Sequence, residues 1–437
     1  MAEEPVTVLR RAPFSSNPAV GARGRKAQQR ILDAALRVFG ELGYHQTGIA
    51  NITDVAGCTR ASFYQYFSSK EDVFRALAGE VARELVLSAD ALAPITSDAA
   101  GWDAAHDWLA RHGDIYARYE PVFDAYQAAE ESDDAVASGS AVVRERNVGI
   151  VRARLTSSTL PARSRDGVIE LLLDCITRTR RVSGLLLDAT AERALDKARI
   201  DRALADLVHR TAHGRIDGIN VQLAPPGRFA RVPDGIARLQ TLNDDAALPE
   251  LTNAGTRTVS GLLDAASDVL LARGYHGTRV DDITEAAGLS HGAFYRYFDN
   301  KGALVRALAS RAIQRVSEAF DAIPEIGGNP PSDTGRAALR KWLRRYASTH
   351  SSEAAMIRVW IDATSDDEEL GLESAAALDW GRIRMARFLQ PRGFGDVQTD
   401  ALLLTVLLDS VGVRRGPDVT EPAALIIVRA LLGHPTA

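Results

Sequence analysis

Two short segments of this chain combine tyrosine and lysine at a spacing that suits contact with DNA phosphates. Each segment reads Phe-Tyr-x-Tyr-Phe-x-x-Lys, first at Phe63–Lys70 and again at Phe294–Lys301. In a helix the two phenylalanines share one face and point into a core, so Tyr64 points elsewhere with its hydroxyl available. Tyr64 and Lys70 can then donate to one phosphate backbone, a contact that fixes register without reading sequence. The alternative is that both are ordinary surface residues, and their presence in both segments disfavours it.

These segments belong to a longer repeat with a constant offset of 231 residues. Residues 31–78 and 262–309 are identical at 22 of 48 positions, with no gap between them. Weaker similarity continues downstream, where Leu-Leu-Asp ends at Asp174 and again at Asp409. A repeat of this length predicts that the chain contains two copies of one unit of about 200 residues.

Each copy begins with a helical pattern. Apolar residues recur at 3.6-residue spacing and predict an amphipathic helix that ends at Gly43, where a left-handed backbone is tolerated. The residues predicted to share the apolar face are Ile31, Leu32, Ala35, Val38, Phe39 and Leu42.

Two shorter helices follow, joined by a glycine turn. Thr47 is the predicted N-cap of a helix over residues 49–56, Gly57 ends that helix, and Thr59 caps the next one. This pattern predicts a helix-turn-helix, whose second helix enters the major groove of DNA. The equivalent residues of the second copy are Thr278, 280–287, Gly288 and Ser290. No run of alternating β-branched residues appears, so the fold is predicted to be all-α.

The overall composition is that of an ordinary globular protein, with 46% hydrophobic and 25% charged residues. Two cysteines in 437 residues rule out a disulfide framework and suit a reducing cytosol. No apolar run is long enough to cross a bilayer, and no apolar signal follows the N-terminus. A cytoplasmic protein without a membrane partner is therefore expected.

The net charge of −5 hides an uneven distribution. Residues 19–78 hold eight Lys/Arg against five Asp/Glu, whereas the stretch before the second copy offers only Arg257. The basic residues packed ahead of the first helix are Arg23, Arg25, Lys26 and Arg30. Because a positive field can be local, we expect a basic, flexible arm over residues 1–25 that reaches DNA on one side.

The motif Thr-Gly-Ile-x-x-Ile-x-x-x-Ala-Gly, followed by Phe-Tyr-x-Tyr-Phe-x-x-Lys, resembles that of the TetR family of bacterial transcriptional regulators. The resemblance covers about 50 residues in each half. It implies a three-helix DNA-binding domain followed by a larger helical domain for ligand binding and dimerisation. It also implies that the last two helices of each unit form a four-helix bundle with a partner unit.

By position in the family motif, the expected contacts to the DNA backbone are Thr47, Tyr64 and Lys70, with Thr278, Tyr295 and Lys301 in the second copy. The expected base-reading residues are Arg60, Ala61, Ser62 and Gln65, and His291, Gly292, Ala293 and Arg296, each set preceded by its capping residue, Thr59 or Ser290.

Two such units in one chain resemble the tandem TetR-type regulators of actinobacteria. The helix pair near 165–183 and 200–213 is expected to pack on the pair near 397–413 and 423–433, which makes the chain its own dimer. The expected domains are the arm (1–25), a first DNA-binding domain (26–75), a first ligand-binding domain (76–213), a linker (214–256), a second DNA-binding domain (257–306) and a second ligand-binding domain (307–437).

The helical domains contain aromatic residues at helical spacing, which more often form a core than line a pocket. As a group they are still the best candidates for an apolar ligand pocket. They are Trp102, His106, Trp108, Tyr116, Tyr119, Phe123 and Tyr126 in the first copy, and Trp342, Tyr346, Met356 and Trp360 in the second. Three histidines of these domains, His106, His112 and His350, lack metal-ligand spacing, so neither a metal nor another cofactor is expected.

These features predict a ligand-responsive transcriptional repressor rather than an enzyme, since no nucleophile–base pair is apparent. One chain is expected to bind a non-palindromic operator in double-stranded DNA through two unlike recognition helices. A small, apolar effector is expected to release it, and further homodimerisation remains open. The alternative is a helical protein-interaction module, derived from such a regulator, that has lost operator binding.

Overall fold

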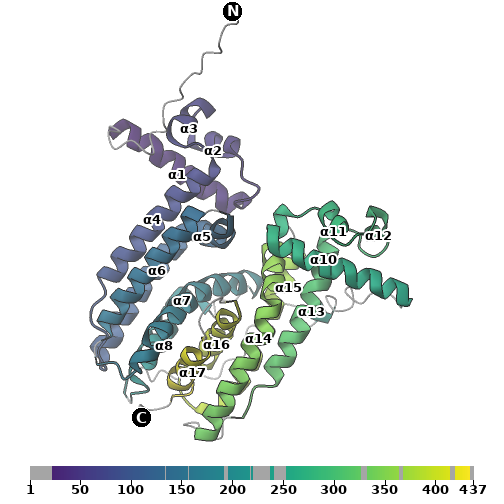
Figure 1. Ribbon diagram of the computed structural model, residues 1–437. Helices are drawn as coiled ribbons and strands as arrows, with labels where there is room; N and C mark the ends of the chain where they lie inside the picture. The colour runs from purple at the N-terminus through teal and green to yellow at the C-terminus, as the bar shows by residue number, and fades with distance from the viewer. Residues whose placement is uncertain are drawn as a thin grey trace, which may run out of the picture. The chain divides into compact units, whose positions relative to one another are not determined.

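The computed structural model describes residues 22–132, 134–155, 157–190, 195–216, 218–219, 237–240, 252–325, 332–363, 368–413 and 419–433. Within these residues every regular element is a helix, which confirms the predicted all-α fold (Figure 1). None of the described helices is both long and apolar enough to span a membrane.

The chain forms two compact units. The first comprises residues 1–87 and 114–143, and the second comprises residues 88–113 and 144–437. The division falls within three helices, α4 (Lys70–Asp90), α5 (Ala99–Ser132) and α6 (Asp134–Arg154). The units therefore do not follow the domain boundaries expected from the repeat, which remain a prediction.

The first unit is built around α1 (Ala22–Leu42), α2 (Ile49–Ala56) and α3 (Arg60–Tyr66). The apolar face of α1 is buried as predicted, with one exception: Leu42 is 43% exposed. Leu42 is the last residue of α1. Gly43 follows with a φ of 76°, the left-handed conformation predicted for the helix end.

A bend in α5 shapes the packing of the first unit. Tyr119 leaves helical geometry with a φ of −115° and a ψ of 20°, two residues before Pro121. Proline lacks an N–H and its ring crowds the preceding turn, so a bend is expected there. The Pro121 ring comes so close to α1 that a Cβ on Gly40 would lie 3.2 Å from it.

In the second unit, α7 (Ala162–Thr190) and α8 (Lys197–His213) come from the first half of the chain. The helices from the second half are α10 (Asn253–Gly277), α11 (Val280–Ala286), α12 (His291–Tyr295), α13 (Lys301–Asp321), α14 (Asp333–Ala363), α15 (Glu368–Leu389), η3 (Gln390–Arg392), α16 (Val397–Val413), α17 (Thr420–Ile426) and η4 (Ile427–Leu431). Because α10 begins at Asn253, residues 253–256 are helical and do not belong to the predicted linker.

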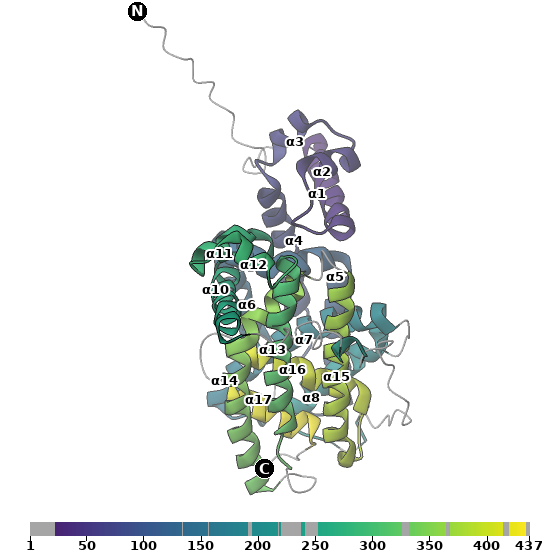
Figure 2. The ribbon, with the colours of Figure 1, turned by 90° about the vertical axis from the view of Figure 1, so that its right-hand side faces the viewer.

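The helix pair α7–α8 and the pair α16–α17 share one apolar core, and they lie against one another in both views (Figures 1 and 2). Leu172 of α7 and Leu407 of α16, which are equivalent in the sequence repeat, are both buried in it. Between the same two helices, Cys175 Sγ lies 3.9 Å from the carbonyl oxygen of Leu403. Segments more than 200 residues apart in the sequence thus pack together in one core.

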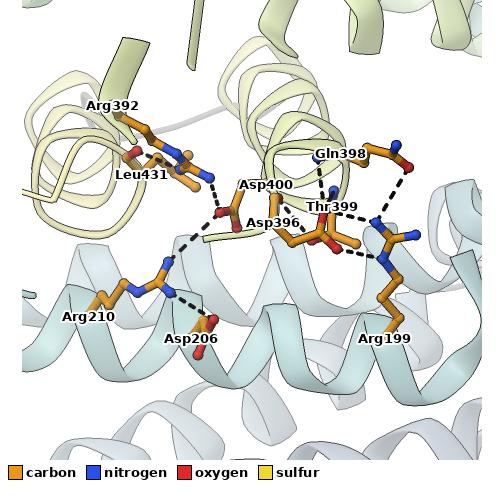
Figure 3. Close-up of polar contacts among 9 residues, drawn as sticks. All are labelled: Arg199, Asp206, Arg210, Arg392, Asp396, Gln398, Thr399, Asp400 and Leu431. Carbon is orange, nitrogen blue, oxygen red and sulfur yellow. Dashed lines mark hydrogen bonds and ion pairs between the residues drawn. The ribbon is translucent and has the colours of Figure 1, made fainter. Parts of the chain in front are cut away.

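Ion pairs connect the same two helix pairs, from arginines of the first half of the chain to aspartates of the second half (Figure 3). Arg199 donates to both carboxylate oxygens of Asp396, from Nε at 2.5 Å and from a terminal nitrogen at 2.9 Å. Arg210 donates to Asp206 on its own helix at 2.8 Å and lies 3.8 Å from Asp400 of α16. Such bidentate and paired contacts favour one register of the helices over others.

Two further arginines, one on α7 and one on η4, connect the two halves of the chain. Arg178 of α7 donates to Asp409 of α16 at 3.0 Å. Arg429 of η4 donates to the carbonyl oxygens of Thr211, at 2.7 Å, and Ala212, at 3.1 Å. The last carbonyls of a helix have no partner within the helix, so Arg429 satisfies acceptors at the end of α8.

Candidate nucleic-acid interface

The first helix-turn-helix consists of α2 and α3. Gly57 ends α2 with a φ of 61°, and the Cys58 N–H donates to the Thr53 carbonyl at 3.0 Å. The Thr59 hydroxyl then accepts from the Ser62 N–H at 3.1 Å and caps α3. The glycine turn and the Thr59 cap are both confirmed.

The second helix-turn-helix, α11 and α12, repeats this geometry. Gly288 has a φ of 64°, and the Leu289 N–H donates to the Thr284 carbonyl at 2.9 Å. Ser290 Oγ accepts from the Ala293 N–H at 3.3 Å and caps α12. The predicted cap at Ser290 is therefore confirmed as well.

Burial of the aromatic residues follows the pattern expected from their spacing. Phe63 and Phe67 are fully buried, whereas Tyr64, between them, is 50% exposed. In the second copy Phe294 is fully buried and Tyr295 is 49% exposed. The two phenylalanines fix each recognition helix on its core, so the tyrosine hydroxyl is presented to solvent.

Most of the residues expected to contact DNA from the recognition helices are exposed. In the first copy these are Thr59, Arg60, Ala61, Tyr64 and Gln65, with Ser62 half-buried. In the second they are Ser290, His291, Gly292, Tyr295 and Arg296, with Ala293 half-buried. Their contact with DNA stays a prediction.

The caps predicted at Thr47 and Thr278 are wrong. The helix N-caps are Gly48 and Arg279, one residue later in each copy. Thr47 is only 3% exposed and its hydroxyl donates to the Gly43 carbonyl at 2.7 Å. Thr278 makes the same contact with the Gly274 carbonyl at 2.8 Å. Both hydroxyls thus donate within their own domain, and a contact of either threonine with the DNA backbone stays a prediction.

The two lysines bind their own chain. Lys70 Nζ donates to the Tyr44 carbonyl at 2.7 Å and lies 4.4 Å from the centre of the Tyr44 ring. Lys301 Nζ donates to the Tyr275 carbonyl at 2.6 Å and lies 3.9 Å from that ring. Partial burial lowers the pKa of Lys70. Each lysine thus holds the loop between the first helix and the helix-turn-helix, and a phosphate contact would be an additional role.

Only residues 22–25 of the expected flexible arm (1–25) lie in the described part of the chain, and these four residues are helical. Residues 1–21 lie outside the described part of the chain, but α1 already starts at Ala22. The four basic residues of the cluster, Arg23, Arg25, Lys26 and Arg30, are therefore exposed side chains on the first turns of α1. Alanine and glutamine at intervening positions favour helix over coil there.

The candidate pocket residues of the first copy are divided between the two units. Tyr116 and Phe123 stack at 4.9 Å within the first unit. Trp102 lies in the second unit, where its Nε1 donates to Asp206 at 2.8 Å. Trp102 also stacks on His106 at 5.1 Å. The remaining members are Trp108, in the second unit, and Tyr119 and Tyr126, in the first.

The candidate pocket residues of the second copy fall into two apolar clusters. Trp342 and Tyr346 stack at 5.3 Å in the cluster that contains α7, α8 and α16. Met356 and Trp360 belong to the core beneath the second helix-turn-helix. A ligand site at any of these residues stays a prediction. Across the described residues, no group of three His, Cys, Asp or Glu side chains is arranged to hold a metal ion.

One contact beside the second recognition helix is not apparent from the motif. His291 Nε2 lies 2.9 Å from Asp281 Oδ1. The first copy has Arg60 and Ala50 at the equivalent positions, so this ion pair is specific to the second copy. Comparing the two copies position by position identifies the substitutions, but the contact itself becomes evident only once α11 and α12 are folded together.

Comparison with known proteins gives the same two segments. The family profile described as "Bacterial regulatory proteins, tetR family" matches residues 31–77 and 262–308. The HTH-type transcriptional repressor AcnR of Corynebacterium diphtheriae is 32% identical over 105 residues, which are 24% of this chain and 53% of that protein. An HTH-type transcriptional repressor of Mycobacterium tuberculosis is 28% identical over 152 residues, 34% of this chain and 79% of that protein.

A third relative is the HTH-type transcriptional regulator EthR of Mycolicibacterium smegmatis, 28% identical over 116 residues. That match covers 26% of this chain and 52% of the relative. The chain thus spans about half the length of two of these three relatives. The matched segments contain the glycine turns and the buried phenylalanines described above. The chain therefore belongs to the TetR family of bacterial regulatory proteins, in a tandem form that carries the family's helix-turn-helix segment twice.

Proposed function

We propose that this chain is a DNA-binding transcriptional repressor in which one chain acts as its own dimer. The observation that supports this most strongly is that the chain carries two unlike recognition helices, while α7 and α8 of the first half share one apolar core with α16 and α17 of the second half. Named relatives that share the helix-turn-helix segment are transcriptional repressors. The repressor activity of this chain is inferred from that likeness and from the exposed polar residues of α3 and α12.

The intramolecular dimer is supported by which helices pack together. The pair α7–α8 and the pair α16–α17 follow corresponding parts of the two copies and bury their apolar faces in one core. Equivalent elements that pack on one another are the mark of two-fold pairing, here between two similar halves rather than two identical chains. Because the halves are covalently linked, their pairing does not depend on protein concentration.

The polar contacts in this core favour pairing of unlike halves. In the ion pairs Arg178–Asp409, Arg199–Asp396 and Arg210–Asp400, the arginine comes from the first half and the aspartate from the second. Burial raises the pKa of Asp206, beside Arg210, to about 6, so this part of the core tolerates charge only where a partner is present. Two of these side chains also have a second partner, because Arg210 donates to Asp206 as well and Asp400 is also paired with Arg392.

The operator is expected to lack palindromic symmetry, because operator symmetry follows protein symmetry. The first recognition helix presents Arg60 and Gln65, and the second presents His291 and Arg296 at the equivalent positions. Arginine suits guanine and glutamine suits adenine, so the preferred bases fall at different places in the two half-sites.

Selection of binding sequences from a pool of random DNA tests this proposal. The full chain should recover one operator with two unlike half-sites. Exchanging the residues at 65 and 296, as Gln65→Arg and Arg296→Gln, should alter base preference in one half-site each. A perfect palindrome would contradict the intramolecular dimer, and failure to bind any sequence would favour the alternative of a protein-interaction module.

We also infer that a small, apolar effector releases the chain from DNA by acting on the helical domains. The inference is supported by the aromatic residues gathered in α5 and α14, which offer apolar and stacking surface. A coupling of about 1–3 kcal/mol between effector and DNA would change affinity roughly 5- to 150-fold. Apolar compounds that raise the melting temperature of the free chain should therefore weaken its DNA complex, whereas stabilising compounds without effect on DNA binding would count against this regulation.

A further inference from the structure

The two helix-turn-helix copies differ in charge, although their folds correspond. Over residues 22–70 the first copy carries seven Lys/Arg and three Asp/Glu, a net charge of +4. The matching residues 253–301 of the second copy carry five Lys/Arg and six Asp/Glu, a net charge of −1. Attraction to phosphates supplies most of the affinity for DNA of any sequence, so the copies cannot contribute equally to it.

Part of the difference lies beside the recognition helix. The second residue of α2 is Ala50, and the equivalent residue of α11 is Asp281. The first residue of α3 is Arg60, and the equivalent residue of α12 is His291. The first pair carries a charge of +1, whereas Asp281 and His291 together carry −1 or 0, depending on whether the histidine is protonated.

The contacts of the two acids on α11 separate their roles. Asp282 accepts from the Arg279 N–H at 2.8 Å and pairs with Arg273, so it caps the helix and its charge is balanced. Asp281 instead points outward, with 79% of its side chain exposed, and lies 2.9 Å from His291 Nε2. Its carboxylate therefore faces the same side of the domain as a residue expected to read bases.

We propose that Asp281 restrains the second recognition helix. Its carboxylate holds His291 and repels phosphate, so the first copy supplies most of the affinity for DNA in general. The second copy binds tightly only where the correct bases replace the contact that His291 gives up with Asp281. Its binding therefore depends more strongly on the DNA sequence than that of the first copy. Asp281 is thus a specificity-determining residue, and this inference rests on the proposed binding of DNA.

The test measures binding of the full chain to two duplexes by fluorescence anisotropy. One duplex carries the selected operator and the other a random sequence of about 30 base pairs, roughly three helical turns. The variant Asp281→Ala installs the residue that the first copy has at this position. Asp268→Ala is the matched control, because it removes one exposed acidic side chain from α10 of the same domain.

Asp281→Ala should bind the random duplex about two- to fivefold more tightly at low salt, the effect of removing one nearby like charge in water. The gain should shrink as salt rises and should be smaller on the operator, so specificity falls. Asp268→Ala should bind both duplexes like the wild type. The reciprocal variant, Ala50→Asp, should weaken binding to the random duplex by a similar factor.

A gain in affinity cannot arise from misfolding, which keeps the test decisive. Unchanged or weaker binding by Asp281→Ala would overturn the inference, and so would an equal gain from Asp268→Ala. If the wild-type chain binds neither duplex, the proposed function fails, and this inference fails with it. The two failures are distinguished by the wild-type titration alone.

Discussion

Two tyrosines are the side chains whose role in DNA binding can be tested most cleanly. Tyr64 and Tyr295 are half-exposed, while the phenylalanines beside them are buried and fix their helices. The neighbouring lysines are less informative, because each also holds backbone carbonyls of its own domain. A lysine variant would therefore change stability and DNA contact together.

Tyr64→Phe should weaken binding to the operator and to random DNA by similar factors, roughly ten- to hundredfold, the worth of one hydrogen bond to a charged group. The free energy of unfolding should stay unchanged, because the lost hydroxyl belongs to an exposed residue. Anisotropy titrations on both duplexes measure the effect. Tyr66→Phe is the control, since Tyr66 packs against the core of the same domain and should not affect DNA binding. A Tyr64→Phe chain with wild-type affinity would remove this residue from the interface.

A buried histidine should make the fold sensitive to acid. His112 is 6% exposed, and burial, together with the charge of Arg180, lowers its pKa to about 3. The unfolded chain binds a proton at this residue near pH 6.5. Between those two values acid therefore favours the unfolded chain, and stability falls as the pH is lowered.

His112→Phe should flatten this dependence, because phenylalanine cannot bind a proton. Denaturant titrations at pH 7, 6 and 5 would show a smaller loss of stability for the variant than for the wild type. Equal losses for the two proteins would mean that His112 is not responsible for the sensitivity to acid.

At the residue scale the sequence predicted local features better than contacts between distant segments. The caps at Thr59 and Ser290 and the burial of Phe63 follow from neighbours within four residues. Thr47 was predicted as a cap from its residue type, yet its hydroxyl binds the Gly43 carbonyl instead. A threonine hydroxyl can accept from a backbone N–H, as in a cap, or donate to a backbone carbonyl, and residue type alone does not decide between the two.

At the scale of elements, close approach between helices restricts which residues fit. Gly412 of α16 faces His350 of α14 so closely that a Cβ would lie 1.9 Å from the imidazole Nδ1. Ser351 Oγ also donates to the Gly412 carbonyl at 2.9 Å, which holds the two helices together at this point. A side chain at position 412 must therefore displace His350 or separate the helices.

Gly412→Ala should lower the free energy of unfolding by about 2 kcal/mol, as overpacked cores do. Gly261→Ala is the matched control, because a Cβ there meets nothing within 4 Å. Alanine has a higher helix propensity than glycine, so the control substitution should raise the free energy of unfolding by up to about 1 kcal/mol. Denaturant unfolding of both variants measures the contrast, and a Gly412→Ala chain as stable as its control would mean that α14 and α16 are not in such close contact.

The helices themselves were largely predictable, but their partners were not. Periodicity and glycine turns predict α2, α3, α11 and α12 and most of α1 and α10, because these signals are local. They miss the first turns of α1 and α10, which begin inside the expected arm and the expected linker. The ion pairs Arg199–Asp396 and Arg178–Asp409 join residues far apart in the sequence. No local pattern marks those residues, and only the packing of α7 and α8 against α16 brings them together.

At the scale of the whole molecule, the central claim is that one chain does the work of a dimer. Both recognition helices are encoded in one sequence, so they can diverge in charge and in bases read without affecting each other. Helices α7 and α8 of the first half and α16 and α17 of the second half share one apolar core. Under the proposed intramolecular dimer, a further copy of the chain is not required for binding to an operator.

The number of chains in the DNA complex tests this claim most directly. Native mass spectrometry of the full chain on its selected operator should show one 47.1 kDa chain per duplex, including at protein concentrations well above saturation. Occupancy should rise without cooperativity, since no second chain has to join. Complexes that appear only with two chains per duplex would contradict the account, because each chain would then supply half of an ordinary dimer.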